Sequence, residues 1–417
     1  MTCMLKASKI RIYPNKTQEK LIIKTMGACR WIYNQYLGYN KKQHALGNKF
    51  VSKYDFDKLV TQLKKTDERY SWLIGIPTKA IKYSIRIAET AFKRFFKGLS
   101  SYPRFKSRKD KVNSYFFIRD NIHFDTGIKN RIKIPNLKSI RISQRNQLPD
   151  ESKIVSGRVI LDHGKYFVSF IYETNRESKV INSSGIGIDL GIKNYLSISD
   201  KYDNYYQVNN FIFDDKYQQY EAKIKRIQQI ISNKANINYK RLETEYTKTN
   251  GVPDDKTKNI LKRRSYDTSG IRKLQNKLSS LHLKKANYSK DIVDKLVYKI
   301  AKTKPEYITI EDLHVKNMIA NIKNAEDNHH TLHDYIQKSM FRYFRTRLEE
   351  KCYECNIELR VANKYFASSK KCSKCGHKKH DLTLDDRVYI CEDCGLIIDR
   401  DLNAAINLCN LKKYIVM

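Results

Sequence analysis

The spacing of hydrophobic positions changes along the chain, and each change predicts a different kind of element. Residues 4–13 alternate between apolar and polar side chains, which predicts a strand with one buried face. Helical spacing follows after Asn15, from Leu21 to Tyr36, and returns over 78–97. Both stretches set an apolar stripe against basic positions, so they predict amphipathic helices packed on a core.

The period changes to two between about residues 115 and 171, where short apolar–polar alternations predict strands. Asp162-His163-Gly164, between two of these strands, has the composition of a tight hairpin turn. We therefore expect a small antiparallel β-barrel in the amino-terminal half. The helical segment 14–110 would be inserted after its first strand.

The carboxyl-terminal half alternates between strands and helices. Its strands are expected at 185–189, 193–199, 205–211, 306–311 and 356–362. Between Asp214 and Ile300 the spacing predicts two long packed helices, joined by residues 232–270 as a loop or an added helix. A further helix is expected near 335–351. This order predicts a mixed α/β domain with an RNase H-like layout.

The charge of the chain indicates a polyanionic partner. The 417 residues carry 81 Lys+Arg against 44 Asp+Glu, a formal net charge of +37, and such an excess repels itself unless a polyanion neutralises it. The 29 Tyr and 16 Phe offer surfaces on which bases can stack. A membrane surface is the rival polyanion, but the sequence has no apolar run of about 18 residues and no signal peptide. We expect an intracellular, soluble, nucleic-acid-binding protein with no membrane partner.

Two Cys-x-x-Cys pairs near the carboxyl end have the spacing of a structural zinc site. The first pair is Cys372 and Cys375, the second is Cys391 and Cys394, and fifteen residues separate the pairs. A glycine follows each pair, where a tight turn often needs a residue without a Cβ. We expect the four thiolates to close on one tetrahedral Zn²⁺. The nine cysteines of the chain fit a reducing compartment with metal use.

The residues after the zinc motif resemble the end of a known protein family. Asp399-Arg400-Asp401-Leu402-Asn403-Ala404-Ala405 is similar to the last motif of the TnpB-type proteins of insertion sequences, relatives of Fanzor proteins and of type V CRISPR effector nucleases. Other parts of the family pattern occur upstream and in order: Tyr13-Pro14, Cys29-Arg30-Trp31-Ile32-Tyr33-Asn34, Tyr102-Pro103-Arg104-Phe105-Lys106, Gly185-Ile186-Gly187-Ile188-Asp189-Leu190-Gly191-Ile192 and Ile308-Thr309-Ile310-Glu311-Asp312-Leu313. The resemblance therefore spans nearly the whole chain.

This resemblance implies an α/β plus β-barrel architecture with four parts. Residues 1–13 and 111–180 are expected to form a wedge β-barrel, 14–110 a helical recognition lobe, 181–365 and 396–417 a RuvC-like nuclease domain, and 366–395 a zinc ribbon inserted in it. In such proteins the wedge and the recognition lobe hold a guide RNA and recognise a short motif beside the target.

Three carboxylates match the catalytic positions of the family: Asp189, Glu311 and Asp401. The first two end apolar strands and the third opens a helix, so all three can meet at one edge of a sheet. Two Mg²⁺ ions about 3.5–4 Å apart suit phosphodiester hydrolysis, and Mg²⁺ prefers carboxylate oxygens. Asp312 competes with Glu311 for its role, and the family pattern favours Glu311. Asp399 competes with Asp401, and the pattern leaves Asp399 as a capping residue or one that orients a ligand.

Five basic residues of the amino-terminal half are candidate nucleic-acid contacts: Arg30, Arg86, Lys93, Arg104 and Lys106. The first three lie off the apolar stripes of the expected helices, where they can contact phosphate. The last two belong to a family motif. A solvated basic face is the alternative interpretation, and the total charge favours the contact.

Two further features are given structural interpretations. Cys352 and Cys355 form a third Cys-x-x-Cys, but no glycine follows it, so core packing is expected. His314 follows Glu311 by three residues and invites a role as proton donor, whereas a surface or phosphate contact is the simpler interpretation.

The function implied by the resemblance is an RNA-guided DNA endonuclease with structural Zn²⁺ and catalytic Mg²⁺. Its partners would be a guide RNA encoded near the transposon end and double-stranded target DNA. It would act in the cytoplasm or nucleoid of a prokaryote, or in the nucleus of a eukaryotic or viral host. The alternatives are a nuclease-inactive RNA-guided DNA-binding regulator, a DNA transposase, and a basic zinc-ribbon protein that packages nucleic acid.

Overall fold

The computed structural model consists of two compact units, Met1–Asn175 and Arg176–Met417. It describes residues 3–108, 112–118, 123–124, 130–134, 136–143, 153–176, 184–200, 204–313, 329–363, 366–382 and 386–417. Over these residues, no helix combines the length and the apolar character that a membrane crossing requires.

The first unit contains a sheet in which every strand is antiparallel to its neighbours. Its strands are β1 Cys3–Tyr13, β2 Val112–Ile118, β3 His123–Phe124, β4 Arg131–Ile134, β5 Lys138–Ile142, β6 Ile154–Asp162 and β7 Lys165–Asn175, in the order β2-β6-β7-β1-β5-β4-β3. The predicted hairpin turn joins β6 to β7, with His163 and Gly164 both at positive φ. The described pairings leave β2 and β3 at the ends of the sheet, so closure into a barrel stays a prediction.

Helices lie between β1 and β2 in the chain, as the sequence predicts: α1 Lys16–Ala45, α2 Lys53–Thr66, the 3₁₀ helix η1 Glu68–Leu73 and α3 Thr78–Phe96. Asn15 caps α1 in a reciprocal arrangement with Gln18, which confirms the expected start of this helix. The pattern analysis did not anticipate α2. Its apolar positions are few, and only Phe56 and Val60 are buried along it.

The second unit contains a mixed sheet with three parallel strands at its centre. Its strands are β8 Ile186–Leu190, β9 Asn194–Asp200, β10 Tyr205–Asn209, β11 Tyr307–Ile310, β12 Glu358–Ala362 and β15 Tyr414–Val416, in the order β10-β9-β8-β11-β12-β15. Strand β11 pairs in parallel with β8 on one side and with β12 on the other. The expected α/β class is confirmed, and β15 is an edge strand that the sequence pattern did not indicate.

The two faces of this sheet have different coverings because side chains alternate along each strand. Ile186 and Ile188 of β8, like Ile308 and Ile310 of β11, belong to the main core with residues of α6 Ser269–Lys302 and α9 Phe341–Cys355. Gly187 faces the other way, against the backbone of α10 Arg400–Cys409. By the same alternation, the face of β8 and β11 that meets α10 also carries Asp189 and leads to Glu311.

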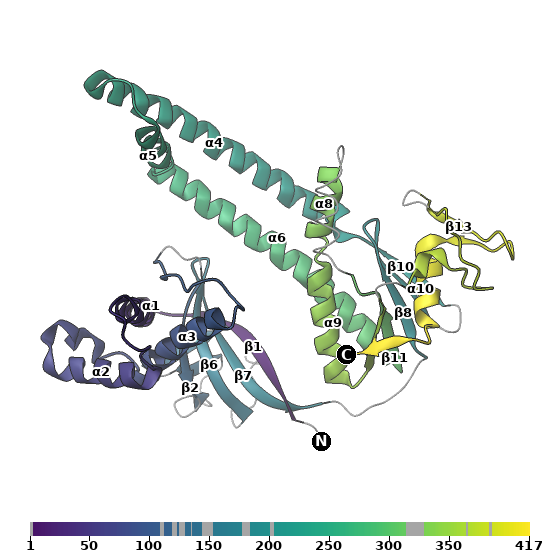
Figure 1. Ribbon diagram of the computed structural model, residues 1–417, viewed down its shortest axis with the longest axis horizontal. Coiled ribbons are helices and arrows are strands. Elements are labelled where there is room, and N and C mark those ends of the chain that lie inside the picture. The colour runs from purple at the N-terminus through teal and green to yellow at the C-terminus, as the bar shows by residue number, and fades with distance from the viewer. Residues whose placement is uncertain are drawn as a thin grey trace. The chain divides into compact units, whose positions relative to one another are not determined.

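The remaining helices of the unit include a long hairpin (Figure 1). The helices of this unit that have not yet been given bounds are the 3₁₀ helix η4 Phe211–Phe213, α4 Asp215–Asn250, α5 Asp255–Ser265, α8 His329–Lys338 and the 3₁₀ helix η5 Ser368–Lys370. Helices α4 and α6 lie side by side through a small apolar cluster of Ile227, Ile231, Ala235 and Ile271, and α5 lies at the far end of the hairpin.

Two sequence expectations about these helices need adjustment. The joint at 232–270 is largely helical, since α4 continues to Asn250 and α5 is the added helix that was one of the two options. The single helix expected near 335–351 is divided, because Met340 adopts a left-handed conformation between α8 and α9.

We predict that Gly187→Ala destabilises the second unit. A Cβ at this position would lie 2.1 Å from the carbonyl oxygen of Ala405, which is backbone and cannot move without moving α10. Overpacking of this kind costs typically 1–3 kcal/mol. Thermal or urea unfolding measures the loss. Gly270→Ala in α6 is the matched control, because nothing lies within 4 Å of its added Cβ. An unchanged stability for Gly187→Ala would show that α10 does not pack this closely.

Candidate active site and metal centre

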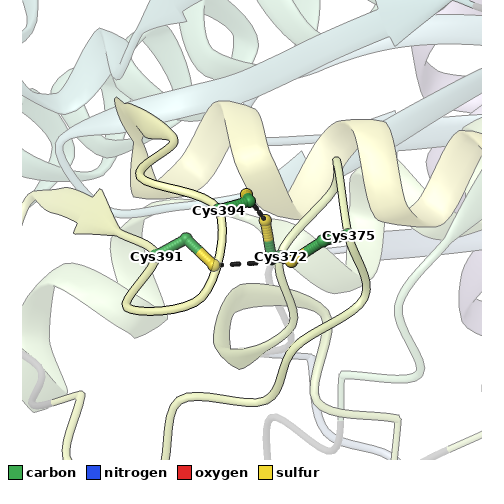
Figure 2. A group of neighbouring side chains, drawn as sticks. All are labelled: Cys372, Cys375, Cys391 and Cys394. Atoms are coloured by element: carbon green, nitrogen blue, oxygen red, sulfur yellow. Dashed lines mark hydrogen bonds between the residues drawn. The ribbon is translucent and has the colours of Figure 1, made fainter.

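The four cysteines of the two knuckles come together as the sequence predicts. Their sulfur atoms all lie within 4.8 Å of one another, with Sγ–Sγ distances of 3.6 Å for Cys372–Cys394 and 3.5 Å for Cys375–Cys391. Figure 2 shows the four side chains pointing toward one another. A tetrahedron with Zn–S bonds of about 2.3 Å requires sulfur atoms roughly 3.8 Å apart. The thiols therefore fit a structural metal ion such as Zn²⁺.

Local backbone geometry prepares these thiols for a metal. Gly376 and Gly395 have φ angles of 83° and 68°, a conformation that side chains rarely adopt, so the expected glycine role is confirmed. Burial raises the pKa of Cys372, but backbone N–H groups of Cys375 and Lys374, together with the thiols of Cys375 and Cys391, lower it to about 7 overall. Burial and the neighbouring thiols raise the pKa of Cys375 and Cys394, so the shift toward the thiolate is specific to part of the cluster. A thiolate is the form that binds metal.

The ribbon around the thiols has a small core of its own. Strands β13 Val388–Ile390 and β14 Ile397–Asp399 pair antiparallel, and Tyr389 of β13 is fully buried beside Cys372 and Leu382. In contrast, Cys352 and Cys355 lie in the main core of the second unit, which confirms that this third pair is packing.

The three predicted carboxylates arise from three different elements. Asp189 lies in β8, Glu311 directly follows β11, and Asp401 lies in the first turn of α10. Because β8 and β11 are parallel neighbours, their carboxyl ends meet at one edge of the sheet. Helix α10 brings the third carboxylate to that edge, since a Cβ on Gly191 would lie only 3.8 Å from the Oδ2 atom of Asp401.

Glycines in and directly before β8 permit this approach. A Cβ on Gly187 would meet the backbone of Ala405 and Cys409, and a Cβ on Gly185 would overlap the ring of Tyr307. The hydroxyl of Tyr307 donates to the carbonyl of Cys409 at 3.0 Å, which fixes the end of α10 against β11. The sequence showed the glycines, but only the fold shows that they serve the packing of α10.

The carboxylates repel one another in a partly desolvated site. Burial raises the pKa of Asp189 well above its ordinary value of 3.8, and the charges of Glu311 and Asp401 raise it further, while Arg400 opposes the shift. Burial also raises the pKa of Glu311. The hydroxyl of Ser368, which donates a hydrogen bond to the Oε1 atom of Glu311, opposes this rise. The two raised pKa values mean that the negatively charged form of each carboxyl group is disfavoured at this site unless a cation is bound.

The oxygens of these three carboxylates are not as closely grouped as the thiols. Among the described residues, the four cysteines are the group whose ligand atoms all lie within 4.8 Å of one another. Mg²⁺ keeps several waters and takes one or two carboxylates directly, so it does not require ligand atoms grouped as closely as those of a zinc site. The carboxylates therefore fit Mg²⁺ by donor chemistry, and their role as its ligands stays a prediction.

The two competing aspartates have structural roles. Asp399 is the N-cap of α10, and its Oδ1 atom accepts hydrogen bonds from the backbone N–H groups of Asp401 and Leu402, each at 3.0 Å. Asp312 forms an ion pair with Arg345 at 2.6 Å. The capping role expected for Asp399 is thus confirmed. His314 lies outside the described residues.

The five candidate nucleic-acid residues occupy different environments in the first unit. Arg86 borders a hollow of about 280 Å³ that Lys79, Lys82 and Tyr83 also line. The ring of Tyr83 stacks on Phe116 at 4.0 Å between centroids. This pairing of cations with aromatic rings is typical of surfaces that bind nucleotides.

The other four residues have identifiable contacts or exposure. Lys93 forms an ion pair with Glu89, a carboxylate buried to 5 % exposure, so its charge also stabilises the fold. Arg30 donates to Asn113 at 3.4 Å, and the ammonium of Lys106 lies 4.0 Å from the ring centroid of Tyr33. Arg104 is exposed. Their contact with nucleic acid stays a prediction.

Sequence reasoning missed several residues around the carboxylates. Ser368 and Arg400 were not singled out, and a groove of about 820 Å³ beside the first knuckle is lined by four lysines: Lys371, Lys374, Lys412 and Lys413. Asn403 and Asn407 are buried on α10 at a spacing of four residues. The family motif contains Asn403 without giving it a role, and the spacing of the two amides on a largely apolar helix is a second signal that could have drawn attention to them.

Comparison with known proteins finds relatives along nearly the whole chain. A model described as "Cas12f1-like, TNB domain" matches residues 341–408, from α9 through the thiol cluster to α10, and one described as "Helix-turn-helix domain" matches residues 1–49. A Streptomyces pristinaespiralis protein named "Putative RNA-guided DNA endonuclease" is 27% identical over 97% of this chain and 88% of its own length. "TnpB-like protein L79" of Acanthamoeba polyphaga mimivirus is 24% identical over 97% of this chain and 72% of its own length. The chain is therefore similar, over nearly its whole length, to proteins named as putative RNA-guided DNA endonucleases and as TnpB-like.

Two details qualify this similarity. Within the described part of the second match, residues 3–49, the structure has strand β1 and the single helix α1 and no helix-turn-helix. The fold is similar to that in "Structure of the mini-RNA-guided endonuclease CRISPR-Cas_phi3", with a TM-score of 0.51 at 10% identity, covering 98% of this chain and 92% of that one. At such low identity the similarity concerns the fold alone.

We predict about one tightly held zinc per purified chain, because the thiols have the geometry of a closed structural site. Elemental analysis measures it. Cys391→Ser combined with Cys394→Ser should lose the metal and lower the melting temperature. Cys352→Ala combined with Cys355→Ala is the control and should keep the zinc. Zinc lost from the Cys352→Ala, Cys355→Ala variant but kept by the Cys391→Ser, Cys394→Ser variant would place the metal elsewhere.

A second prediction concerns pH in buffer freed of Mg²⁺ by ion-exchange resin, which leaves structural zinc in place. Because the pKa of Asp189 is raised on folding, the folded state binds more protons between pH 3.8 and the raised pKa. Below this pH range, Asp189 makes its full contribution to the free energy of unfolding. That contribution is lost as the pH rises through the range. Asp189→Asn should flatten this dependence and be at least as stable as wild type at neutral pH.

Thermal melts with and without Mg²⁺ test this prediction. Added Mg²⁺ should raise the melting temperature of wild type at neutral pH more than that of Asp189→Asn, since only the carboxylate gains from the ion. The exposed Asp255→Asn should behave as wild type. A wild-type profile identical to that of Asp189→Asn would contradict the electrostatic account of the site.

Proposed function

We propose that this protein is an RNA-guided DNA endonuclease that hydrolyses target DNA at a RuvC-like site formed by Asp189, Glu311 and Asp401. The observation that carries the proposal is the convergence of these carboxylates from β8, β11 and α10 at one sheet edge. Relatives that match 97% of the chain are named as putative RNA-guided DNA endonucleases, which supports the same activity here.

Divalent metal is the cofactor that this electrostatic environment favours. Burial and mutual repulsion disfavour the charged forms of Asp189 and Glu311, so a bound cation would remove the main cost of ionising them. When bound, a pair of Mg²⁺ ions supplies an activated water and stabilises the attacking and leaving oxygens. The three carboxylates would hold these ions. The hydroxyl of Ser368 would orient Glu311, and Arg400 would reduce the remaining negative charge.

Basic surfaces on both units support nucleic-acid partners. The groove lined by Lys371, Lys374, Lys412 and Lys413 adjoins η5, which carries Ser368 against Glu311. A phosphate backbone in this groove would lie near the candidate site. In the first unit, the hollow beside Arg86 joins cations with the stacked rings of Tyr83 and Phe116.

The division of labour implied by the family is part of the proposal. The wedge, 1–13 and 111–180, and the recognition lobe, 14–110, would hold a guide RNA encoded near the transposon end and recognise a short motif beside the double-stranded target. Residues 181–365 and 396–417 would form the RuvC-like domain, with 366–395 as its zinc ribbon. Sequence choice would come from base pairing of the guide.

Single substitutions of the carboxylates test the activity. Protein purified with its RNA, given a DNA target complementary to that RNA, should cut it in the presence of Mg²⁺. Asp189→Ala, Glu311→Ala and Asp401→Ala should each lose more than the roughly 10–100-fold typical of residues that only orient a metal ligand. Target binding, measured by mobility shift, should remain, because each change removes negative charge from a nucleic-acid site.

The structure supplies sharper controls than alanine at the neighbouring aspartates. Asp399→Asn keeps the cap of α10, since Asn and Asp are comparable N-caps, and Asp312→Asn removes the charge facing Arg345. Both should retain measurable cleavage. Cleavage by all three alanine variants would place the nuclease site elsewhere. Binding without cleavage in wild type would favour a guided regulator, and joined DNA ends would favour a transposase.

A further inference from the structure

Two buried amides connect helix α10 to the first zinc knuckle. Asn403 is fully buried and Asn407 is 9 % exposed, one helical turn further along α10. The Nδ2 group of Asn403 donates to the carbonyl of Lys371 at 2.7 Å, and its Oδ1 atom accepts from the N–H of Ser373 at 2.9 Å. These backbone groups immediately flank Cys372. One side chain therefore fixes both sides of a zinc-ligand position.

Asn407 extends this contact toward the candidate catalytic site. Its Nδ2 group donates to the carbonyl of Lys371 at 2.6 Å and to the carbonyl of Ser368 at 2.8 Å. The hydroxyl of Ser368 in turn donates to Glu311. An unbroken series of hydrogen bonds thus leads from α10 through the segment before the knuckle to the second carboxylate.

The third carboxylate is connected to the ribbon from its other side. Asp399 is the last residue of β14 and pairs with Val388 of β13, so the ribbon hairpin ends where α10 begins. Asp399 also caps the turn that carries Asp401. Helix α10 is therefore attached to the ribbon at its start, through Asp399, and along its side, through Asn403 and Asn407.

The energetics make these amides sensitive to the state of the knuckle. A buried polar group that loses its hydrogen-bond partner is left desolvated without compensation, so a change in the backbone beside Cys372 would disfavour the present position of α10. The turn of a four-thiolate knuckle is held by its metal. Without the ion, the two amides would lose the fixed partners that position α10.

We propose that Asn403 and Asn407 are positioning residues that couple the thiolate centre to the carboxylate site. Zinc in the ribbon thereby sets the affinity of Asp189, Glu311 and Asp401 for divalent metal. This inference rests on the proposed function, because it assigns a metal to the carboxylates. Loss of zinc, or of the amides, would leave the carboxylates present but misplaced.

The test measures the Mg²⁺ concentration that gives half-maximal cleavage and half-maximal thermal stabilisation. Asn403→Leu and Asn407→Leu should each raise both midpoints by about tenfold, the lower range for groups that orient metal ligands. They should also release zinc to a chelator faster than wild type does. Asn40→Leu in the first unit is the matched control, since Asn40 is equally buried and binds backbone of Val51. It should lower the melting temperature without moving either midpoint.

Wild-type protein stripped of zinc provides a second route that needs no substitution. Its Mg²⁺ midpoints should shift as they do in Asn403→Leu. Removing zinc from Asn403→Leu should shift the midpoints little further, because both changes break the same connection between the thiolate centre and the carboxylates. A lower melting temperature with unchanged midpoints in the amide variants and in stripped wild type would overturn the coupling. Wild type that responds to Mg²⁺ in neither assay would overturn the proposed function together with it.

Discussion

Helix α10 and strand β8 approach so closely that no side chain fits between them at Gly187. The carbonyl of Ala405 and the N–H of Cys409 occupy the space where a Cβ would lie. This contact decides how far the first turn of α10 reaches over the edge of the sheet. Asp401 shares a site with Asp189 and Glu311 because the helix lies at this distance and in this direction. The site therefore depends on glycine, which has no side chain, at position 187 as much as on the three carboxylates.

The same packing creates an electrostatic conflict. Three acidic side chains share a partly desolvated edge, and burial with mutual repulsion raises the pKa of Asp189 and Glu311. Apolar packing by α10 and by the main core compensates for this local cost. A stable fold that holds unfavourable negative charge is a fold prepared for a cation. Under the proposed function, a bound divalent cation would relieve this conflict.

The ribbon and the carboxylate site form one mechanical unit through α10. Its hydrogen bonds reach the first knuckle through Asn403 and the segment beside Glu311 through Asn407 and Ser368. Under the proposed coupling, a metal held by the four thiols would also stiffen the element that carries the third carboxylate. Buried polar networks make an element more rigid because each of their members has few alternative hydrogen-bond partners.

The sequence by itself determined the local features: the period of each element, the cap at Asn15, the knuckle spacing of the cysteines and, through motif resemblance, the three carboxylates. These depend on neighbours along the chain, which a sequence displays directly. It did not indicate α2 or β15, whose apolar patterns are short, and it left Asp399 and Asp401 in competition. Only the tertiary structure buried Glu89, the helical partner of Lys93, against the backbone N–H of Lys53 and gave Asn403 its partners beside Cys372. Those outcomes depend on residues distant in the chain that meet only when α3 packs on α2 and α10 packs on the first knuckle, and no local pattern records which backbone groups will then face each other.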